Sequence, residues 1–124
     1  MRGDAAFLER LFTIGRAAVS IPQPVLAEIA FGIERLPRSK RQQRLRRRYE
    51  LIREEIERSK WSDEVSQAFG RIKAGLERRG ALVEDLDIAI AAHAVATGAV
   101  LVSTNLSHMA RIPGLEVEDW TRVG

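Results

Sequence analysis

The sequence predicts an α/β fold in which helices cover both faces of a mostly parallel central sheet, giving a three-layer α/β/α sandwich. Short β-prone runs alternate along the chain with helical patterns of about 10 to 20 residues, an order typical of parallel sheets. The clearest example is an alanine-rich helical segment that Gly98 stops, followed directly by the β-rich residues 99–103. A chain of 124 residues without an internal repeat or a low-complexity linker predicts one domain.

The first quarter of the chain predicts two helices with a short strand between them. Asp4 is placed to cap a helix that ends at Gly15, and residues 17–21 form a β-prone run. Pro22 and Pro24 suit the start of the next helix, where a missing backbone amide costs nothing. That helix carries an apolar stripe that we expect to be buried: Val25, Leu26, Ile29, Ala30 and Ile33.

The middle of the chain predicts two further helices. Residues 38–58, beyond Pro37, form a long polar pattern in which apolar residues recur at helical spacing: Leu45, Tyr49, Ile52 and Ile56. Asp63 is the expected N-cap of the following helix, which ends near Gly80. Its inward positions are expected to be Val65, Ala68, Phe69, Ile72 and Leu76.

The remaining residues predict a helix and two strands. The helix begins at Asp85 or Leu86, and strands are expected at residues 100–103 and 115–118. Pro113 and Gly114 form the turn that precedes the second strand.

Asp87 is the strongest candidate for a chemical role, because it is one carboxylate in an otherwise apolar helical stretch. Ligands of parallel sheets bind beyond the carboxyl ends of the strands, and helices begin at the same edge. We therefore expect Asn105, which follows the strand at residues 100–103, to lie close to Asp87. The alternative is an ordinary acid stabilised by the helix dipole, a role for which Asp85 is better placed.

Composition limits the classes of function. The chain has no cysteine, which excludes thiol catalysis, cysteine-ligated zinc and disulfides and fits a reducing compartment. Its longest mostly apolar stretch, residues 88–102, is shorter than the ~18 residues of a membrane span. The N-terminal residues lack the order of a signal peptide. We therefore expect a cytoplasmic protein with no membrane partner.

Basic residues gather in one segment. The net charge is +3 with a pI near 9.9, and between Arg38 and Arg48 seven of eleven residues are basic and none is acidic. Such a segment attracts phosphate, although a solvated helix face would show the same pattern. A basic helical DNA-binding module built on residues 35–58 is a weaker alternative, since aromatic residues are few and no helix-turn-helix spacing is evident.

Two motifs resemble the PIN-domain nucleases, specifically the VapC-type toxins of bacterial toxin–antitoxin modules. The first is the order of Asp87 in an Ile-Ala-Ala helix, a strand bounded by glycine, Thr104-Asn105, Ile-Pro-Gly-Leu at 112–115 and a tryptophan near the end. The second is Leu-Ala-Glu-Ile-Ala-Phe-Gly at 26–32, which matches a family motif whose glutamate is an active-site acid. The resemblance extends from Ala17 over most of the chain and implies a PIN-like α/β/α sandwich.

The resemblance implies a metal-dependent endoribonuclease toxin. Asp87 and Glu28 would bind Mg²⁺ or Mn²⁺, and Asn105 would act beside these two catalytic acids by orienting water or phosphate. The resemblance also implies an RNA substrate, a homodimer and a cognate antitoxin that inserts a peptide into the acidic groove. The candidate RNA-binding residues are Arg41, Arg44, Arg48 and His108.

Two further residues are expected to serve structure alone. His93 lies six positions beyond Asp87 in the helix and is expected to be packed or exposed rather than catalytic. Glu34 is expected to face solvent and to pair with Arg38 at i,i+4 spacing.

The sequence departs from the family pattern in two places. Relatives open with a hydrophobic strand that ends in Asp-Thr/Ser-Asn/Ser and supplies the first metal-binding aspartate. We expect residues 1–124 to form a single PIN-like domain that lacks this usual first strand, through truncation before Met1. The loop that often reads Arg-Asp-Phe in relatives reads Ser107-His108-Met109 here, without the acid. These departures leave open a catalytically impaired protein that only dimerises or binds antitoxin.

Overall fold

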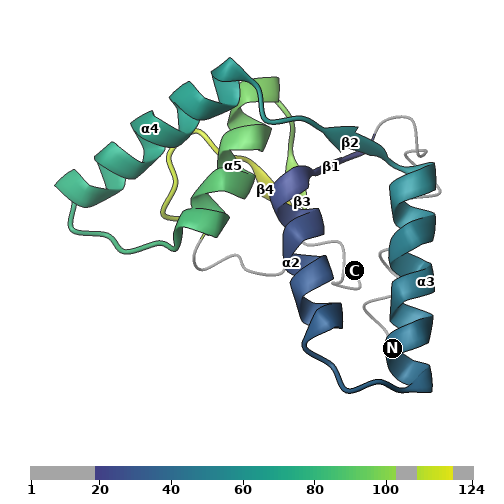
Figure 1. Cartoon of the computed structure of the whole chain (residues 1–124). Coiled ribbons are helices and arrows are strands. Elements are labelled where there is room, and N and C mark those ends of the chain that lie inside the picture. The colour runs from purple at the N-terminus through teal and green to yellow at the C-terminus, as the bar shows by residue number, and fades with distance from the viewer. Residues whose placement is uncertain (1–18, 103–108, 119–124) are drawn as a thin grey trace. The chain divides into compact units, whose positions relative to one another are not determined.

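The computed structural model describes residues 19–102 and 109–118, which form two compact units. One unit comprises residues 19–60 and the other comprises residues 61–102 and 109–118. The elements, in chain order, are β1 (Ser20–Pro22), α2 (Gln23–Glu34), α3 (Lys40–Glu55), β2 (Glu57–Ser59), α4 (Asp63–Arg78), α5 (Asp85–Thr97), β3 (Leu101–Val102) and β4 (Val117–Glu118) (Figure 1).

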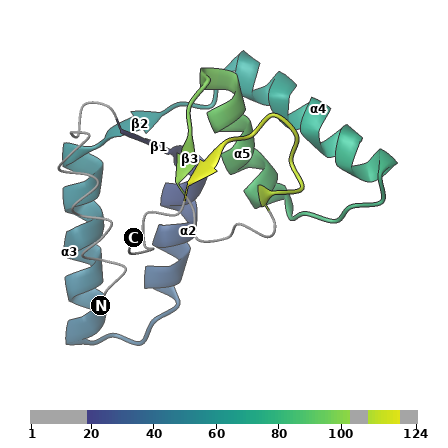
Figure 2. The ribbon, with the colours of Figure 1, turned by 180° about the vertical axis from the view of Figure 1, so that it is seen from behind.

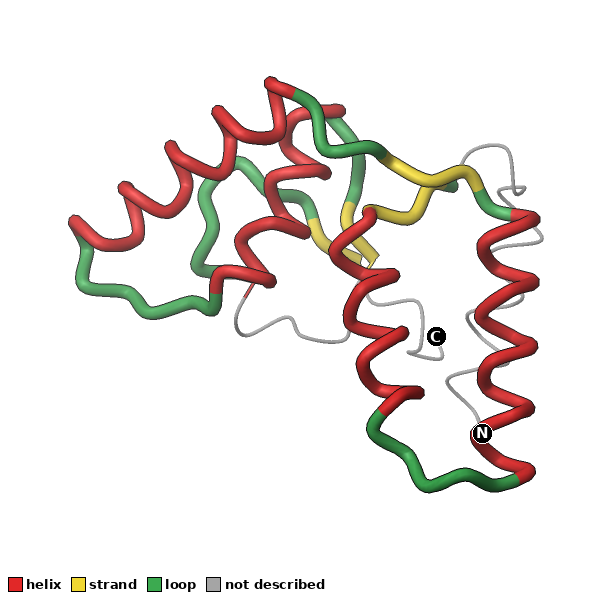
Figure 3. The backbone as a smooth tube through the Cα atoms, viewed as in Figure 1, coloured by secondary structure: helices red, strands yellow, loops and turns green. Residues whose placement is uncertain are grey.

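The first unit is a helical hairpin joined to a parallel pair of strands. α2 and α3 lie side by side and are connected at one end by a short loop (Figure 3). β1 and β2 pair in parallel, with Ser20 opposite Glu57 and Pro22 opposite Ser59. The proline-rich start of α2 is confirmed, because Pro22 is its N-cap and α2 begins at Gln23.

Gln42 links the two helices of this hairpin. Its side-chain Nε2 donates hydrogen bonds to the backbone oxygens of Ile33, at 2.9 Å, and Leu36, at 3.0 Å. Backbone oxygens at the end of a helix have no partner within that helix, so the amide of Gln42 supplies one from α3. Ser39 begins α3 by accepting a hydrogen bond from the backbone amide of Gln42 at 3.1 Å.

The predicted helix over residues 38–58 was too long at its C-terminal end. α3 ends at Glu55, Ile56 adopts an extended backbone conformation, and Glu57 to Ser59 form β2. The side chains of Glu57 and Arg58 are both exposed, so β2 lacks the alternation of apolar and polar residues that identifies a strand. Pairing with β1 decides its conformation.

The second unit is built on the packing of α4 against α5 (Figure 1). Ala68, Ala91 and Ala92 are completely buried, and their small side chains suit a close approach of helix backbones. The predicted inward positions of α4 are confirmed as buried at Val65, Ala68, Ile72 and Leu76, while Phe69 is half-buried. No helix within the described ranges is both long and apolar enough to cross a bilayer.

β3 and β4 form the second parallel pair, with Leu101 opposite Val117 and Val102 opposite Glu118 (Figure 2). The turn predicted before β4 is confirmed at Gly114, whose φ of 80° lies in the left-handed region that glycine adopts readily. Gly98 ends α5 with a φ of 66°, as the sequence predicted. Both strand pairs are parallel, which agrees with the predicted α/β class.

Helix capping differs from the prediction at α4. Ser62 is the N-cap, because its hydroxyl accepts a hydrogen bond from the backbone amide of Val65 at 3.3 Å. Asp63 is instead the first helical residue, where its negative charge still meets the positive end of the helix dipole. The predicted helix after Asp4 and the ends of two predicted strands, residues 17–18 and Ser103, lie outside the described residues.

Candidate functional site

Asp87 lies in the first turn of α5, at the boundary between solvent and core. Its side chain is half-buried, and the seven residues that follow it, Ile88 to Ala94, are all buried. The free backbone amides and the dipole at a helix start stabilise a negative charge. Asp87 therefore places a carboxylate, the group that hard divalent cations prefer as a ligand, beside an apolar core.

The other acid of this turn, Asp85, has a structural partner. Its carboxylate accepts a hydrogen bond from Lys73 Nζ of α4 at 2.9 Å, and this bond and the attraction between the charges raise the pKa of Lys73. Asp85 and Asp87 are two positions apart, or about 200° around the helix axis. Asp85 therefore anchors the start of α5 to α4, while Asp87 faces a different side of α5.

Glu28 lies in α2, in the unit formed by residues 19–60, whereas Asp87 lies in the other unit. Its side chain is exposed, and the buried Leu26 and Ile33 lie on another face of α2. Phe31, one turn further along, is 65% exposed, and the guanidinium of Arg35 lies 5.6 Å from its ring centroid. Glu28 is thus presented on an accessible face of α2 beside an exposed aromatic ring.

Glu34 does not pair with Arg38 as the sequence predicted. Its carboxylate instead accepts a hydrogen bond from Arg46 of α3 at 3.1 Å. α2 ends at Glu34, so Arg38 lies beyond the helix and the i,i+4 geometry of the prediction does not exist. Glu34 serves the helical hairpin rather than the candidate site.

The metal-binding prediction rests on donor chemistry. Carboxylate oxygens are the ligands that Mg²⁺ and Mn²⁺ prefer, and Mg²⁺ often takes only one or two protein carboxylates. Asp87 and Glu28 fit that chemistry. Within residues 19–102 and 109–118, no group of three or more histidines, cysteines or acids is arranged to hold a metal ion. Asn105 and His108 lie outside the described residues.

His93 is packed into the core of the second unit, which is one of the two positions, packed or exposed, that the sequence left open. Its side chain is 1% exposed and meets the ring of Trp61 edge-on, with 5.6 Å between ring centroids. Trp61 is held in turn by a hydrogen bond from its indole Nε1 to the Ser66 hydroxyl at 2.7 Å. Burial lowers the pKa of His93 below its ordinary value. These contacts assign His93 to the core.

The buried imidazole predicts a loss of stability in mild acid. In the unfolded chain His93 takes up a proton near its ordinary pKa of 6.5, whereas in the folded protein its pKa is lower. Between those two values the unfolded state binds more protons, so the stability from His93 is complete above pH 6.5 and is lost as the pH falls. We expect Tm to fall between pH 7 and pH 5, measured by circular dichroism, and to fall less in His93→Leu. Equal pH dependence in both proteins would contradict this assignment.

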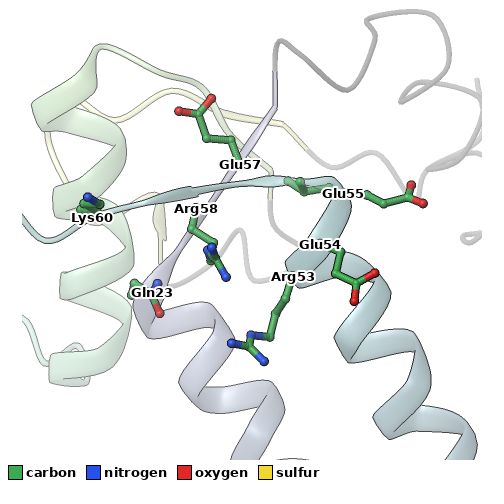
Figure 4. A pocket seen from close by; sticks show the side chains of 8 residues that line it. Gln23, Arg53, Glu54, Glu55, Glu57, Arg58 and Lys60 are labelled. Atoms are coloured by element: carbon green, nitrogen blue, oxygen red, sulfur yellow. The ribbon is translucent and has the colours of Figure 1, made fainter.

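A surface hollow of about 480 Å³ lies in the first unit, around the end of α3 and β2. Arg58 and Glu57 point to opposite sides of β2, and Arg58 lies on the same side as Gln23 and Arg53 (Figure 4). The sequence did not predict this hollow, because it depends on β2. Its walls carry charges of both signs and none of the candidate acids: Gln23, Arg53, Glu54, Glu55, Ile56, Glu57, Arg58 and Lys60.

Comparison with known proteins identifies the family. A family model described as PIN domain matches residues 2–115. Ribonuclease VapC2 of Rickettsia felis is 29% identical over 104 residues, covering 84% of this chain and 75% of that protein. The tRNA(fMet)-specific endonuclease VapC of Shigella flexneri is 26% identical over 121 residues, covering 98% of this chain and 89% of that protein.

Solved structures support the same fold. The DNA-bound VapBC of Salmonella typhimurium superposes with a TM-score of 0.81 at 30% sequence identity, covering 92% of this chain and 84% of that chain. The expected PIN-like α/β/α architecture is thereby confirmed.

Proposed function

The chain belongs to the PIN-domain family, and we propose that it is a metal-dependent endoribonuclease toxin of a type II toxin–antitoxin module. The similarity to VapC ribonucleases over most of the chain supports this function. The observation that carries it is Asp87, a half-buried carboxylate at the start of the apolar helix α5, in the position that the family motif gives to an active-site acid. We take residues 1–124 as one such domain.

The proposed site works through its own carboxylates and amide. Asp87 and Glu28 supply the oxygens that bind Mg²⁺ or Mn²⁺, and Asn105 orients water or the scissile phosphate through its side-chain amide. A bound divalent cation supplies Lewis-acid chemistry and neutralises charge on the phosphate. The Lys73–Asp85 ion pair links the first turn of α5, in which Asp87 lies, to α4.

The proposal extends to partners and compartment. Similarity to VapBC complexes supports a cognate antitoxin as the partner of this chain, and we propose that the chain forms a homodimer. The absence of cysteine agrees with a cytoplasmic location, where thiols stay reduced.

Two measurements test this function: the metal dependence of RNA cleavage and the effect of replacing Glu28. We expect the purified chain to cleave RNA in the presence of Mg²⁺ or Mn²⁺, and we expect EDTA to abolish this cleavage. Denaturing gels measure the cleavage. Glu28→Gln removes one proposed ligand charge and should slow cleavage by at least about 10- to 100-fold, the loss that follows when only an outer-shell partner of a metal ligand is removed. Glu34→Gln is the matched control, because Glu34 lies on the same helix but pairs with Arg46. Cleavage that persists in EDTA, or an equal loss in both variants, would contradict the proposal.

A second candidate function is a catalytically impaired PIN protein that only dimerises or binds antitoxin. The observation that favours it is Ser107-His108-Met109, which places no acid where relatives often carry one. This function requires capture of the antitoxin without turnover of RNA at any metal concentration. Metal-dependent cleavage by the purified chain would eliminate it.

A further inference from the structure

The charges of α3 run in the reverse order to that expected of an isolated helix. Six basic residues and no acid lie in its first nine positions: Lys40, Arg41, Arg44, Arg46, Arg47 and Arg48. The acids follow in the second half, at Glu50, Glu54 and Glu55. A helix start carries a partial positive charge, so six cations and no acid in the first nine positions are unfavourable there, while the last turn holds Arg53 as well as Glu54 and Glu55.

The neighbouring helix α4 shows the usual order. Asp63 and Glu64 occupy its first turn, and Arg78 lies in its last turn. The reversed order in α3 therefore follows no general tendency of this chain. Positions that break a local rule without a structural gain are expected to serve binding or catalysis. No residue of α3 is fully buried, so its basic half gains little from the core.

Five of the six cations form one exposed stripe. At 100° per residue, Lys40, Arg41, Arg44, Arg47 and Arg48 lie within an arc of about 120°. All five are exposed, while Leu45 and Tyr49, which lie outside this arc, are half-buried. We call these five residues the basic stripe. It includes the predicted Arg41, Arg44 and Arg48 and adds Lys40 and Arg47.

The ion pairs of this unit lie beside the basic stripe. Arg46 pairs with Glu34 at 3.1 Å, and Arg53 pairs with Glu50 at 3.1 Å. Within the part of the chain that the structure describes, none of the five stripe residues forms an ion pair. The hairpin therefore neutralises the flanking arginines and leaves the stripe with its full positive charge.

We propose that the basic stripe binds the phosphodiester backbone of RNA, the substrate class of the proposed nuclease function on which this inference rests. Guanidinium groups match phosphate geometry, and four of the five cations are arginines. The stripe contains no aromatic residue on which a base would stack, so the binding is independent of sequence. Protein partners need a buried apolar anchor, whereas the stripe offers only Leu51, at its end.

Salt dependence of binding tests the stripe without catalysis. The affinity for a fluorescein-labelled single-stranded RNA is measured by anisotropy in EDTA over a range of salt concentrations. Each phosphate contact on a single strand contributes about 0.7 to the slope of log K against log salt. The triple variant Arg44→Gln, Arg47→Gln, Arg48→Gln should therefore lower the slope by about 2 and weaken binding at low salt. Arg46→Gln, on the same helix, should leave the slope unchanged.

Arg41→Glu separates binding from folding. A negative charge in the first turn of α3 favours the helix dipole, so Tm should rise or stay constant while RNA affinity falls. The proposal is overturned if the triple variant binds RNA like the unchanged protein, or if Arg46→Gln lowers the salt slope as much as the triple variant does. It is also overturned if the triple variant loses binding to the antitoxin but keeps its affinity for RNA. RNA binding is measured in EDTA and therefore does not depend on cleavage. If the protein failed to cleave RNA in the separate assay with Mg²⁺ or Mn²⁺, the proposed function would be refuted and the binding result would still stand.

Discussion

Asp87→Asn is expected to reduce metal-dependent RNA cleavage by on the order of 10²- to 10³-fold, the range seen when one charge-stabilising group is removed from an active site. Asparagine keeps the size of the side chain and removes the charge. Asp87 borders the core but is itself half-buried in the first turn of α5, so the substitution leaves the buried residues in place. The loss should therefore appear in the rate of cleavage, with the circular dichroism spectrum unchanged.

Asp85→Asn is the matched control for this variant. It is the same substitution two positions earlier in the same helical turn, but Asp85 is exposed and pairs with Lys73. We expect Asp85→Asn to cleave RNA within a few-fold of the unchanged protein. A second readout is the rise in Tm on adding Mg²⁺, which should be smaller in Asp87→Asn and retained in Asp85→Asn. Equal effects of the two variants on both readouts would show that Asp87 has no special role.

The second unit was largely predictable from sequence, because its local signals agree with its packing. α4 has apolar residues at helical spacing, and four of its predicted inward residues are buried. α5 begins at Asp85 and ends at Gly98, as the acidic start and the glycine indicated. Where propensity, periodicity and capping point to the same element, the tertiary structure has little to override.

β2 and the partner of Glu34 were not predictable, because both depend on residues distant in sequence. Residues 57–59 carry no strand pattern of their own and become a strand by pairing with β1. Glu34 meets Arg46, twelve positions away, because the hairpin brings α2 beside α3. Local sequence patterns indicate whether a segment is helical or extended, but they do not indicate which other segment packs against it.

The residues of the candidate site also differ in how far the sequence alone could identify them. Asp87 stands out from composition alone, as an acid in an apolar helix, whereas Glu28 stands out only through its resemblance to a family motif. The basic run at residues 38–48 was visible in sequence, but its division into neutralised and unneutralised arginines was not. That division requires the Glu34 to Arg46 ion pair, which the structure supplies.

Leu76→Ala is expected to destabilise the folded protein by about 2 to 5 kcal/mol, the cost of removing a buried leucine side chain and leaving a cavity. Leu76 is 2% exposed and is among the largest fully buried side chains of the core. It lies in the last turns of α4, where its backbone oxygen also accepts a hydrogen bond from Ala81 at 2.9 Å. The substitution leaves that bond in place, so the free energy of unfolding reports side-chain packing alone.

Leu82→Ala is the matched control, because it makes the same chemical change at a leucine of the same unit that is 86% exposed. Surface substitutions usually change stability by less than about 0.5 kcal/mol, so the two variants should differ by at least about 1.5 kcal/mol in urea denaturation. If Leu76→Ala unfolds at the same urea concentration as Leu82→Ala, Leu76 does not contribute to a packed core. A large difference would show that the packing around α4 stabilises the same unit that presents Asp87, since α4 both buries Leu76 and anchors the start of α5 through Lys73.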